Sequence, residues 1–167
     1  SGNPETLPEN IAQLQMFGAI AEATHTKRWG KNKLISQANF HWINATYDFA
    51  GEDTRDGKQL IFTPRYTGNF TITLQSTLWG AYINGQFVGT SYASSDNSSK
   101  LDPYVLFETG GFYQKKKWRI GGVISNILNT AYYTQPRTPL PGLSFNTYIT
   151  NNTNVFNDCQ CICCNVI

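Results

Sequence analysis

A strict two-residue alternation of apolar and polar side chains is the feature that most limits what this chain can form. It is clearest over residues 65–75, where the even positions are Tyr66, Gly68, Phe70, Ile72 and Leu74. The odd positions of the same stretch are Arg65, Thr67, Asn69, Thr71, Thr73 and Gln75. Successive side chains of a β-strand point to opposite faces, so this stretch predicts a strand with one apolar and one polar face.

The same period recurs along most of the chain, whereas helical periodicity is hard to find. We therefore expect an all-β fold of about seven strands, at residues 11–26, 33–47, 65–75, 79–90, 104–113, 118–128 and 143–149. Many of these segments reach ten residues, whereas strands of soluble proteins average about five or six. The facing of the first segment stays ambiguous.

The connections between these segments alternate in length. Tight turns are expected at residues 28–32, 75–78 and 114–117, and long polar loops at residues 49–64, 93–103 and 130–142. A regular short–long order puts every second connection at the same end of the sheet, which predicts an antiparallel up-and-down meander. Transmembrane barrels have short periplasmic turns and longer extracellular loops, so this order favours a segment of such a barrel.

Aromatic residues lie close to both kinds of connection. Three tryptophans lie in or beside the short turns: Trp29, Trp79 and Trp118. Six tyrosines lie near the long loops: Tyr47, Tyr66, Tyr92, Tyr104, Tyr132 and Tyr133. Two aromatic bands flanking an apolar belt are typical of a barrel in lipid. The alternative is a soluble β-sandwich, a ligand-binding module for carbohydrate, whose aromatics fill a core or a concave face.

Composition excludes several other classes. The 167 residues carry a formal net charge of +2 and only 14% are charged, so nucleic acid is not expected as a partner. The chain has no run of about 20 apolar residues, which excludes a membrane-spanning helix. Its first residues, Ser1 to Glu5, have neither the basic start nor the apolar core of a leader peptide. We expect either an internal piece of a longer protein or a secreted chain whose leader was removed.

The alternation assigns side chains to the two faces of the sheet. We expect one convex apolar face that carries Phe70, Ile72, Leu74, Ile83, Phe87, Val105, Phe107, Ile120 and Ile124. The other face should carry Thr71, Thr73, Tyr82, Asn84, Glu108 and Arg119. A carboxylate in the middle of a strand belongs on a polar lumen face, where Glu108 can pair with Arg119 of the next strand.

No constellation of residues indicates catalysis. The chain has no nucleophile elbow, P-loop or dinucleotide glycine pattern, so we expect no enzyme, no catalytic residues and no cofactor. The two histidines, His25 and His41, have no cysteine or carboxylate at metal-ligand spacing, and we expect them to be solvated or to face a lumen. An acidic cluster at Glu52, Asp53 and Asp56, with Arg55, could bind a cation, but a solvated loop is the favoured interpretation.

Four stretches resemble motifs of the TonB-dependent outer-membrane receptors. Residues 62–68, FTPRYTG, resemble the entry to a late barrel strand of that family, and residues 118–133 resemble its penultimate strand. Residues 139–145 are similar to the proline-rich loop before its last strand, and residues 10–22 are similar to an earlier strand. Within the second stretch, we expect Asn126 to bond loop backbone and end the strand rather than to act catalytically.

The resemblance implies the C-terminal part of the β-barrel of an outer-membrane transporter, which carries an iron chelate, cobalamin or a glycan. It also implies the outer membrane as location, and as partners membrane lipid, the remaining strands, a plug domain, TonB through that plug, and a small nutrient. Which nutrient is carried and which residues bind it cannot be read from the sequence. Family barrels have 22 strands, so we expect a fragment that lacks the plug and forms an open, twisted and curved sheet with residues 11–26 on its outer edge.

Residues 151–167 depart from the family pattern. We expect residues 1–150 to form the barrel portion, and the Asn- and Cys-rich tail to lie outside the sheet with few contacts. All four cysteines fall in this tail: Cys159, Cys161, Cys163 and Cys164. Such thiolates can gather Cu(I) or Zn, but the favoured interpretation is an appended tail without a folded role. The first 158 residues then contain no disulfide.

Overall fold

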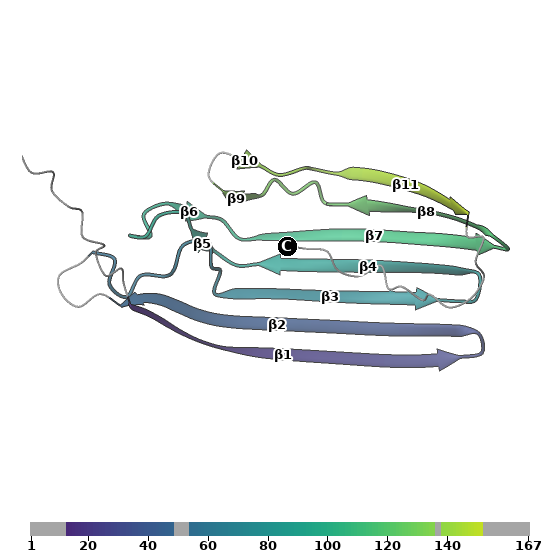
Figure 1. Ribbon diagram of the computed structural model, residues 1–167, viewed down its shortest axis with the longest axis horizontal. Coiled ribbons are helices and arrows are strands. Elements are labelled where there is room, and N and C mark those ends of the chain that lie inside the picture. Colours follow the sequence, from purple (N-terminus) through teal and green to yellow (C-terminus); the bar gives the residue numbers. More distant parts are fainter. Residues whose placement is uncertain (1–12, 49–53, 136–137, 152–167) are drawn as a thin grey trace, which may run out of the picture.

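The described residues of the computed structural model, 13–48, 54–135 and 138–151, form eleven strands and no helix. Seven strands join in one antiparallel sheet whose spatial order follows the sequence (Figure 1): β1 (Gln13–Trp29), β2 (Asn32–Asp48), β3 (Tyr66–Gln75), β4 (Trp79–Val88), β7 (Tyr104–Lys115), β8 (Trp118–Ser125) and β11 (Ser144–Asn151). Each strand of this order pairs with its sheet neighbours, which confirms the predicted meander. No helix of the described part could cross a membrane.

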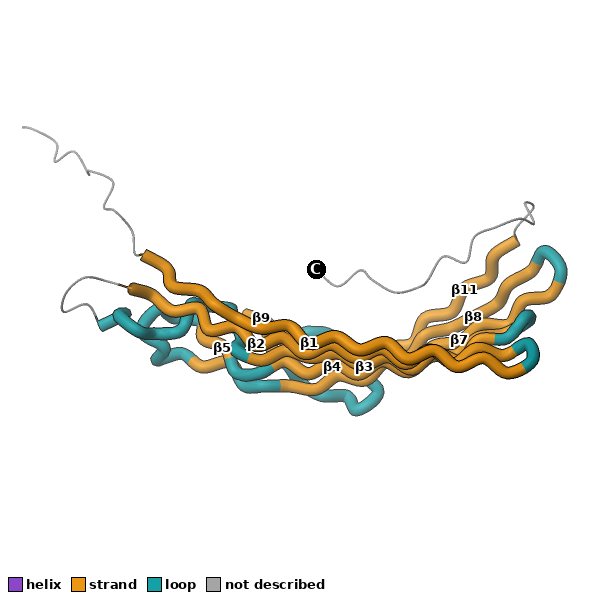
Figure 2. The backbone as a smooth tube through the Cα atoms, turned by 90° about the horizontal axis from the view of Figure 1, so that it is seen from below, coloured by secondary structure: helices purple, strands orange, loops and turns teal. Residues whose placement is uncertain are grey.

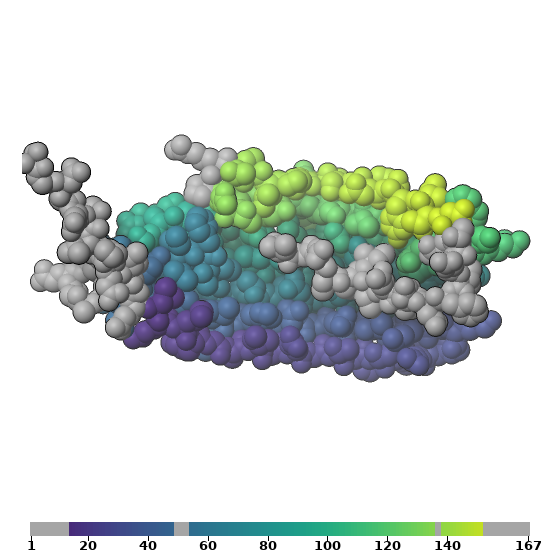
Figure 3. Space-filling view, viewed as in Figure 1, coloured from purple at the N-terminus to yellow at the C-terminus, as the bar shows by residue number. Residues whose placement is uncertain are grey.

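The sheet is open. β1 and β11 are its two edges and lie at opposite margins of the molecule (Figures 1 and 3). In the described part of the chain no second sheet packs against this one, so the β-sandwich considered from the sequence is wrong. A sandwich needs apolar side chains of two sheets facing each other, whereas here the large apolar side chains of one face are exposed.

The long loops hold short strands that the sequence did not indicate. β5 (Ser91–Tyr92) pairs with β6 (Lys100–Leu101), and β9 (Tyr133–Gln135) pairs with β10 (Thr138–Pro139). All four lie at the end of the sheet opposite the three short turns, as Figure 1 shows. The expected separation of short and long connections to the two ends is therefore confirmed.

Some strand ends differ from the predicted ones. β8 ends at Ser125 rather than at residue 128, because Asn126 has a positive φ of 51° that turns the chain out of the ladder. β1 runs on to Trp29, three residues past the expected end. β11 includes Asn151, so the expected boundary after residue 150 falls inside a strand. The expected position of the tail from residue 152 onward lies outside the described residues.

The pairing register fixes the faces of the sheet, because residues directly opposite each other in neighbouring strands share a face. Ile72 lies opposite Ile83, and Asn84 lies between Thr71 and Glu108. Followed across β3, β4, β7 and β8, the register puts all the predicted apolar residues on one face and all the predicted polar residues on the other. We call these the outer face and the inner face.

The sheet is curved and twisted (Figure 2), and burial agrees with the expectation that the apolar face is convex. All six predicted polar residues are half-buried, whereas seven of the nine predicted apolar residues are exposed. Side chains on the concave side of a curved sheet crowd one another, which explains why the polar side chains are the more covered ones.

The aromatic bands are confirmed at one end only. Register places Trp29, Trp79 and Trp118 together on the outer face beside the short turns. At the long-loop end Tyr66 lies on the outer face, but Tyr47 and Tyr104 lie on the inner face. The sequence expectation failed for these two because it used distance from the loops and not strand phase.

The edge strand β1 has large apolar side chains on both faces. Phe17 lies on the outer face, where it packs edge-on against Trp42 with ring centroids 5.6 Å apart. Met16 and Ile20 lie on the inner face and are exposed. This double apolar character explains why the facing of the segment could not be read from its alternation.

Candidate functional site

The outer face presents a continuous exposed apolar surface, which we call the outer belt. Its exposed members come from β2, β3, β4, β7, β8 and β11: Phe40, Phe70, Ile72, Ile83, Phe87, Val105, Ile120, Ile124, Phe145 and Ile149. Large contiguous apolar surfaces are rare on proteins that stay dissolved in water, and they mark contact with lipid or with another protein. The outer belt is therefore one functional surface of the chain.

The inner face has a hydrogen-bonded carboxylate at its centre. Glu108 on β7 accepts hydrogen bonds from the Tyr82 hydroxyl and from the Ser125 hydroxyl, both at 2.7 Å. Tyr82 reaches the carboxylate because its ring lies over Gly110, where an added Cβ would be 2.6 Å from the ring. The carboxylate thus links three neighbouring strands, β4, β7 and β8.

Arg119 is not the partner of Glu108 that the sequence suggested. It lies opposite Gln114, nearer the short turns, whereas the register aligns Glu108 with Asn84. Its guanidinium instead covers the ring of Phe112, 3.6 Å from the ring centroid, an arrangement that the quadrupole of the ring favours. Within the described residues its buried Nε has no hydrogen-bond partner.

Side-chain amides extend the polar inner face toward β1. Asn84 donates to the Thr71 hydroxyl at 2.8 Å and to the Phe70 carbonyl at 3.2 Å. Asn69 donates to the Asn39 side chain at 3.2 Å. Cross-strand polar pairs of this kind stabilise a sheet face that is in contact with water or with polar partners. The inner face therefore has the chemistry of a hydrated lumen wall.

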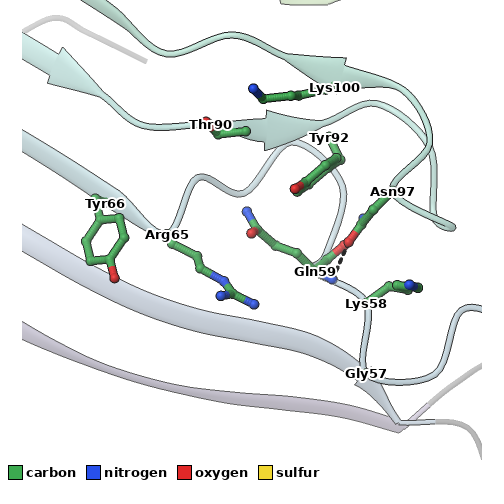
Figure 4. A pocket seen from close by; sticks show the side chains of 9 residues that line it. All are labelled: Gly57, Lys58, Gln59, Arg65, Tyr66, Thr90, Tyr92, Asn97 and Lys100. Atoms are coloured by element: carbon green, nitrogen blue, oxygen red, sulfur yellow. Dashed lines mark hydrogen bonds between the residues drawn. The ribbon is translucent and has the colours of Figure 1, made fainter.

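A pocket of about 470 Å³ lies among the long loops (Figure 4). Nine residues line it: Gly57, Lys58, Gln59, Arg65, Tyr66, Thr90, Tyr92, Asn97 and Lys100. Figure 4 shows the Gln59 and Tyr92 side chains pointing toward the middle of the pocket, Arg65 and Lys100 at opposite edges of it, and the Lys58 side chain turned outward. None of the nine is acidic, so the lining has three formal positive charges.

The loops around the pocket are tied together by paired hydrogen bonds. The Gln59 amide N–H donates to the Asn97 side-chain oxygen and the Asn97 side-chain nitrogen donates to the Gln59 carbonyl, both at 2.8 Å. Asn97 holds this position with a φ of 60°, a conformation that asparagine tolerates better than most residues. The Phe62 N–H donates to the Tyr92 carbonyl at 2.8 Å.

Buried side chains in the loops around the pocket indicate that these loops hold their shape without a ligand. Five of the described residues other than glycine are buried, and four of them lie in these loops or in the strand ends against them: Ala45, Gln59, Ser91 and Leu101. Gln59 also donates its side-chain amide to the Thr63 carbonyl. A loop cluster that buries its own side chains holds one shape, which lowers the entropic cost of binding a ligand.

Comparison with protein families shows to which family the chain belongs. The family described as "TonB dependent receptor-like, beta-barrel" matches residues 1–127. The chain belongs to this TonB-dependent receptor family. The match covers β1 to β8 and both loops that form the pocket. Curated protein sequences gave no match.

Solved structures of TonB-dependent receptors share the fold. The copper transporter OprC superposes with a TM-score of 0.63 at 15% sequence identity, over 84% of this chain and 24% of that protein. BauA, the ferric preacinetobactin receptor from Acinetobacter baumannii, superposes with a TM-score of 0.50 at 16% identity, over 81% of this chain and 26% of that protein. The chain thus spans about a quarter of either structure, and the likeness concerns the fold alone.

The other candidate residues do not assemble a site in the described part of this TonB-dependent receptor chain. His41 lies on the inner face, as expected, whereas His25 lies exposed on the outer face near a short turn. The described residues contain no group of three or more potential metal ligands. Glu52 and Asp53 of the acidic loop, and the cysteines of the tail, lie outside the described residues.

Sequence reasoning missed the pocket. Lys58, Arg65 and Lys100 stand in segments that were expected to be solvated loops or a strand entry, and 42 positions separate the first from the last. The only local signal is Asn97, whose type suits both a positive φ and a side-chain bridge to another loop. That signal marks a turn, and it does not say which other loop the turn meets.

Proposed function

We propose that this chain forms part of the wall of an outer-membrane receptor that imports a scarce nutrient with energy transmitted by TonB. The observation that carries the proposal is the two-faced sheet in a chain of the TonB-dependent receptor family. One face presents the exposed outer belt, and the other presents hydrogen-bonded polar groups such as Glu108. A lipid-facing and a lumen-facing surface on alternating side chains is what a transmembrane barrel requires.

Membrane lipid is the partner proposed for the outer belt, and the bacterial outer membrane is the proposed location. The three tryptophans at the short-turn end suit the inner interface of that membrane, because indole rings favour the headgroup level. The short turns would then face the periplasm and the pocket would face the outside.

We propose that further parts of the receptor pair with the two open edges of the sheet and fill the space beside its inner face. Further strands would pair with the bare edges of β1 and β11, since an unpaired edge is not stable in lipid. A plug domain would fill the lumen against the inner face and receive TonB. Residues 1–150, with Asn151 at the end of β11, would belong to the barrel, and the tail from residue 152 would lie beyond it without a role in transport. The receptor would carry an iron chelate, cobalamin or a glycan, and no catalytic step is proposed.

Deletion of the gene tests this function. We expect the intact protein in the outer-membrane fraction, and we expect the deletion strain to lose uptake of one nutrient when that nutrient is scarce. Loss of TonB should abolish the same uptake without removing the protein from the membrane. A protein recovered as a soluble monomer that unfolds cooperatively without detergent would contradict the proposal.

A further inference from the structure

We infer that the loop pocket is a phosphate-binding site, which takes the phosphate group of a lipid headgroup or of a free solute. The inference goes beyond nutrient import and depends on the proposed function only for the side of the membrane on which the pocket lies. Its basis is that three cationic residues from separate segments of the chain, Lys58, Arg65 and Lys100, line one cavity.

Charge is the first argument. Three formal positive charges line the pocket, and its nine described lining residues include no carboxylate. The ion pair of Lys100 with Asp102, at 3.5 Å between two largely exposed side chains, is of the kind that stabilises little. In the described part of the chain no ion pair of Lys58 or Arg65 is found. Among the described lining residues, the positive charges of Lys58 and Arg65 are therefore not paired with a carboxylate.

The amount of charge favours phosphate over a single carboxylate. A phosphate monoester carries a charge of about −1.5 to −2 near pH 7 and offers three acceptor oxygens. A single carboxylate would neutralise only about one of the three cations. Arginine binds phosphate in a fork of two parallel hydrogen bonds, and lysine adds a mobile point charge. Arg65 at one edge of the lining, with the flexible Lys58 and Lys100 at other edges, supplies one fork and two point charges of this kind.

Neutral donors and rigidity add to the argument. The Thr90 and Tyr92 hydroxyls line the same cavity and can donate to phosphate oxygens. The reciprocal hydrogen bonds between Gln59 and Asn97 hold the two loops at a fixed separation before any ligand arrives. A volume of about 470 Å³ leaves room for the group that bears the phosphate.

The place of the pocket in the fold allows the phosphate to come from a lipid or from a solute. Tyr66 lines the pocket and its ring stacks on Phe40 of the outer belt, with centroids 6.1 Å apart and an interplanar angle of 25°. The pocket therefore adjoins the edge of the apolar surface, where lipid headgroups would lie. It is also part of the long loops, where a solute from outside would arrive.

The experiment measures binding by the full receptor in uncharged detergent micelles. The lipid arm compares micelles that contain phosphatidic acid with micelles that contain diacylglycerol, which differ only in the phosphate. The solute arm titrates inorganic phosphate. We expect binding of phosphatidic acid, inorganic phosphate or both, weakened by sodium chloride, and no binding of diacylglycerol. Binding of phosphatidic acid alone assigns the lipid source, and binding of inorganic phosphate assigns a free solute.

Charge-removing variants decide whether the pocket is responsible. Arg65→Gln should weaken binding about tenfold or more, since it removes charge-assisted hydrogen bonds, and Arg65→Lys should weaken it less. Lys58→Gln/Lys100→Gln leaves every hydrogen bond of the described loops in place and should weaken binding severalfold. The control Lys31→Gln/Lys117→Gln removes the same charge from exposed turns at the other end of the sheet and should stay within twofold.

Three results would overturn the inference: no binding of either phosphate probe, equal binding of diacylglycerol, or equal weakening by the control pair. Nutrient uptake is measured separately on the same variants. A receptor that binds phosphate but imports nothing contradicts only the proposed function, and a receptor that imports but binds no phosphate contradicts only this inference.

Discussion

The Tyr82 hydroxyl donates a 2.7 Å hydrogen bond to Glu108 across the β4–β7 pair, on the polar face of a sheet whose other face is apolar. The two residues are not directly opposite, since Tyr82 pairs with Gly110. The missing side chain at Gly110 lets the tyrosine ring lie flat along β7 and reach the carboxylate two residues away. A glycine inside a strand thus positions a polar contact of the inner face.

Tyr82→Phe should destabilise the folded protein by about 1 kcal/mol, because it removes one hydrogen bond to a carboxylate that keeps its other donor, Ser125. Ser125→Ala should cost a similar amount, and the double variant should cost more than the sum of the two, because the carboxylate then loses both donors. The measurement is unfolding by urea in phospholipid vesicles. Tyr113→Phe on the outer face is the matched control and should change the free energy of unfolding little.

An arginine placed at Ile83 should destabilise the barrel by about 2 to 4 kcal/mol if the outer belt faces lipid, because a charge near the middle of the bilayer is costly. Ile83 stands near the centre of β4 with a relative exposure of 38%, and it lies opposite Ile72 on β3 and Thr109 on β7. Gln86→Arg puts the same side chain on the inner face of the same strand and should cost far less. Equal costs for the two variants in vesicle refolding would contradict a lipid-facing outer belt.

The sheet could be predicted from the sequence because each strand carries its own evidence. The alternation from Phe70 to Leu74 fixes the phase of β3, and similar runs fix β4, β7 and β8 independently of tertiary contacts. β1 shows the limit of this method, because Met16 and Phe17 are both large and apolar yet lie on opposite faces. In that strand only the pairing with β2 decides the phase.

The pocket could not be predicted because it depends on contacts between loops. Arg65 and Lys100 are 35 positions apart, and nothing in their local sequences relates them. They are brought together by the Gln59–Asn97 hydrogen bonds and by the short β5–β6 pair. Turn residues such as Ser94 and Asp96 indicate that the chain reverses, but the partner of a reversed loop is set by the tertiary structure.

Asn126 is the position where sequence reasoning about a single side chain was confirmed. Its amide donates to the Thr130 and Pro141 carbonyls at 2.9 and 3.2 Å, and its oxygen accepts from the Thr130 N–H at 2.9 Å. It is buried and has a positive φ of 51°. The residue therefore ends β8 and fixes both ends of the following loop.

Asn126→Ala should cost about 3 kcal/mol or more, because it removes these three hydrogen bonds and strains a non-glycine residue at positive φ. Asn126→Gly keeps the backbone conformation, so it should relieve the strain but should not restore the hydrogen bonds. Asn129→Ala is the comparison, since Asn129 also has a positive φ, of 50°, but among the described residues its side chain accepts only from the Leu143 N–H, at 3.0 Å. Protease cleavage within residues 130–142 should be faster in Asn126→Ala than in Asn126→Gly or Asn129→Ala, and equal cleavage of all three variants would contradict this prediction.

The turn at residues 94–98 should loosen in acid. Hydrogen bonds from the Ser94 side chain, the Ser98 backbone and the Ser98 side chain lower the pKa of Asp96 from 3.8 to about 2. A pKa that is lower in the folded turn than in the open one means that the carboxylate stabilises the turn above about pH 4 and that this stabilisation is lost as the pH falls toward 2. The amide resonance of Ser98, whose N–H donates to Asp96 at 3.1 Å, should titrate with that low midpoint. Asp96→Asn should abolish the titration, and a Ser98 midpoint near 3.8 would show that the three hydrogen bonds do not hold the carboxylate.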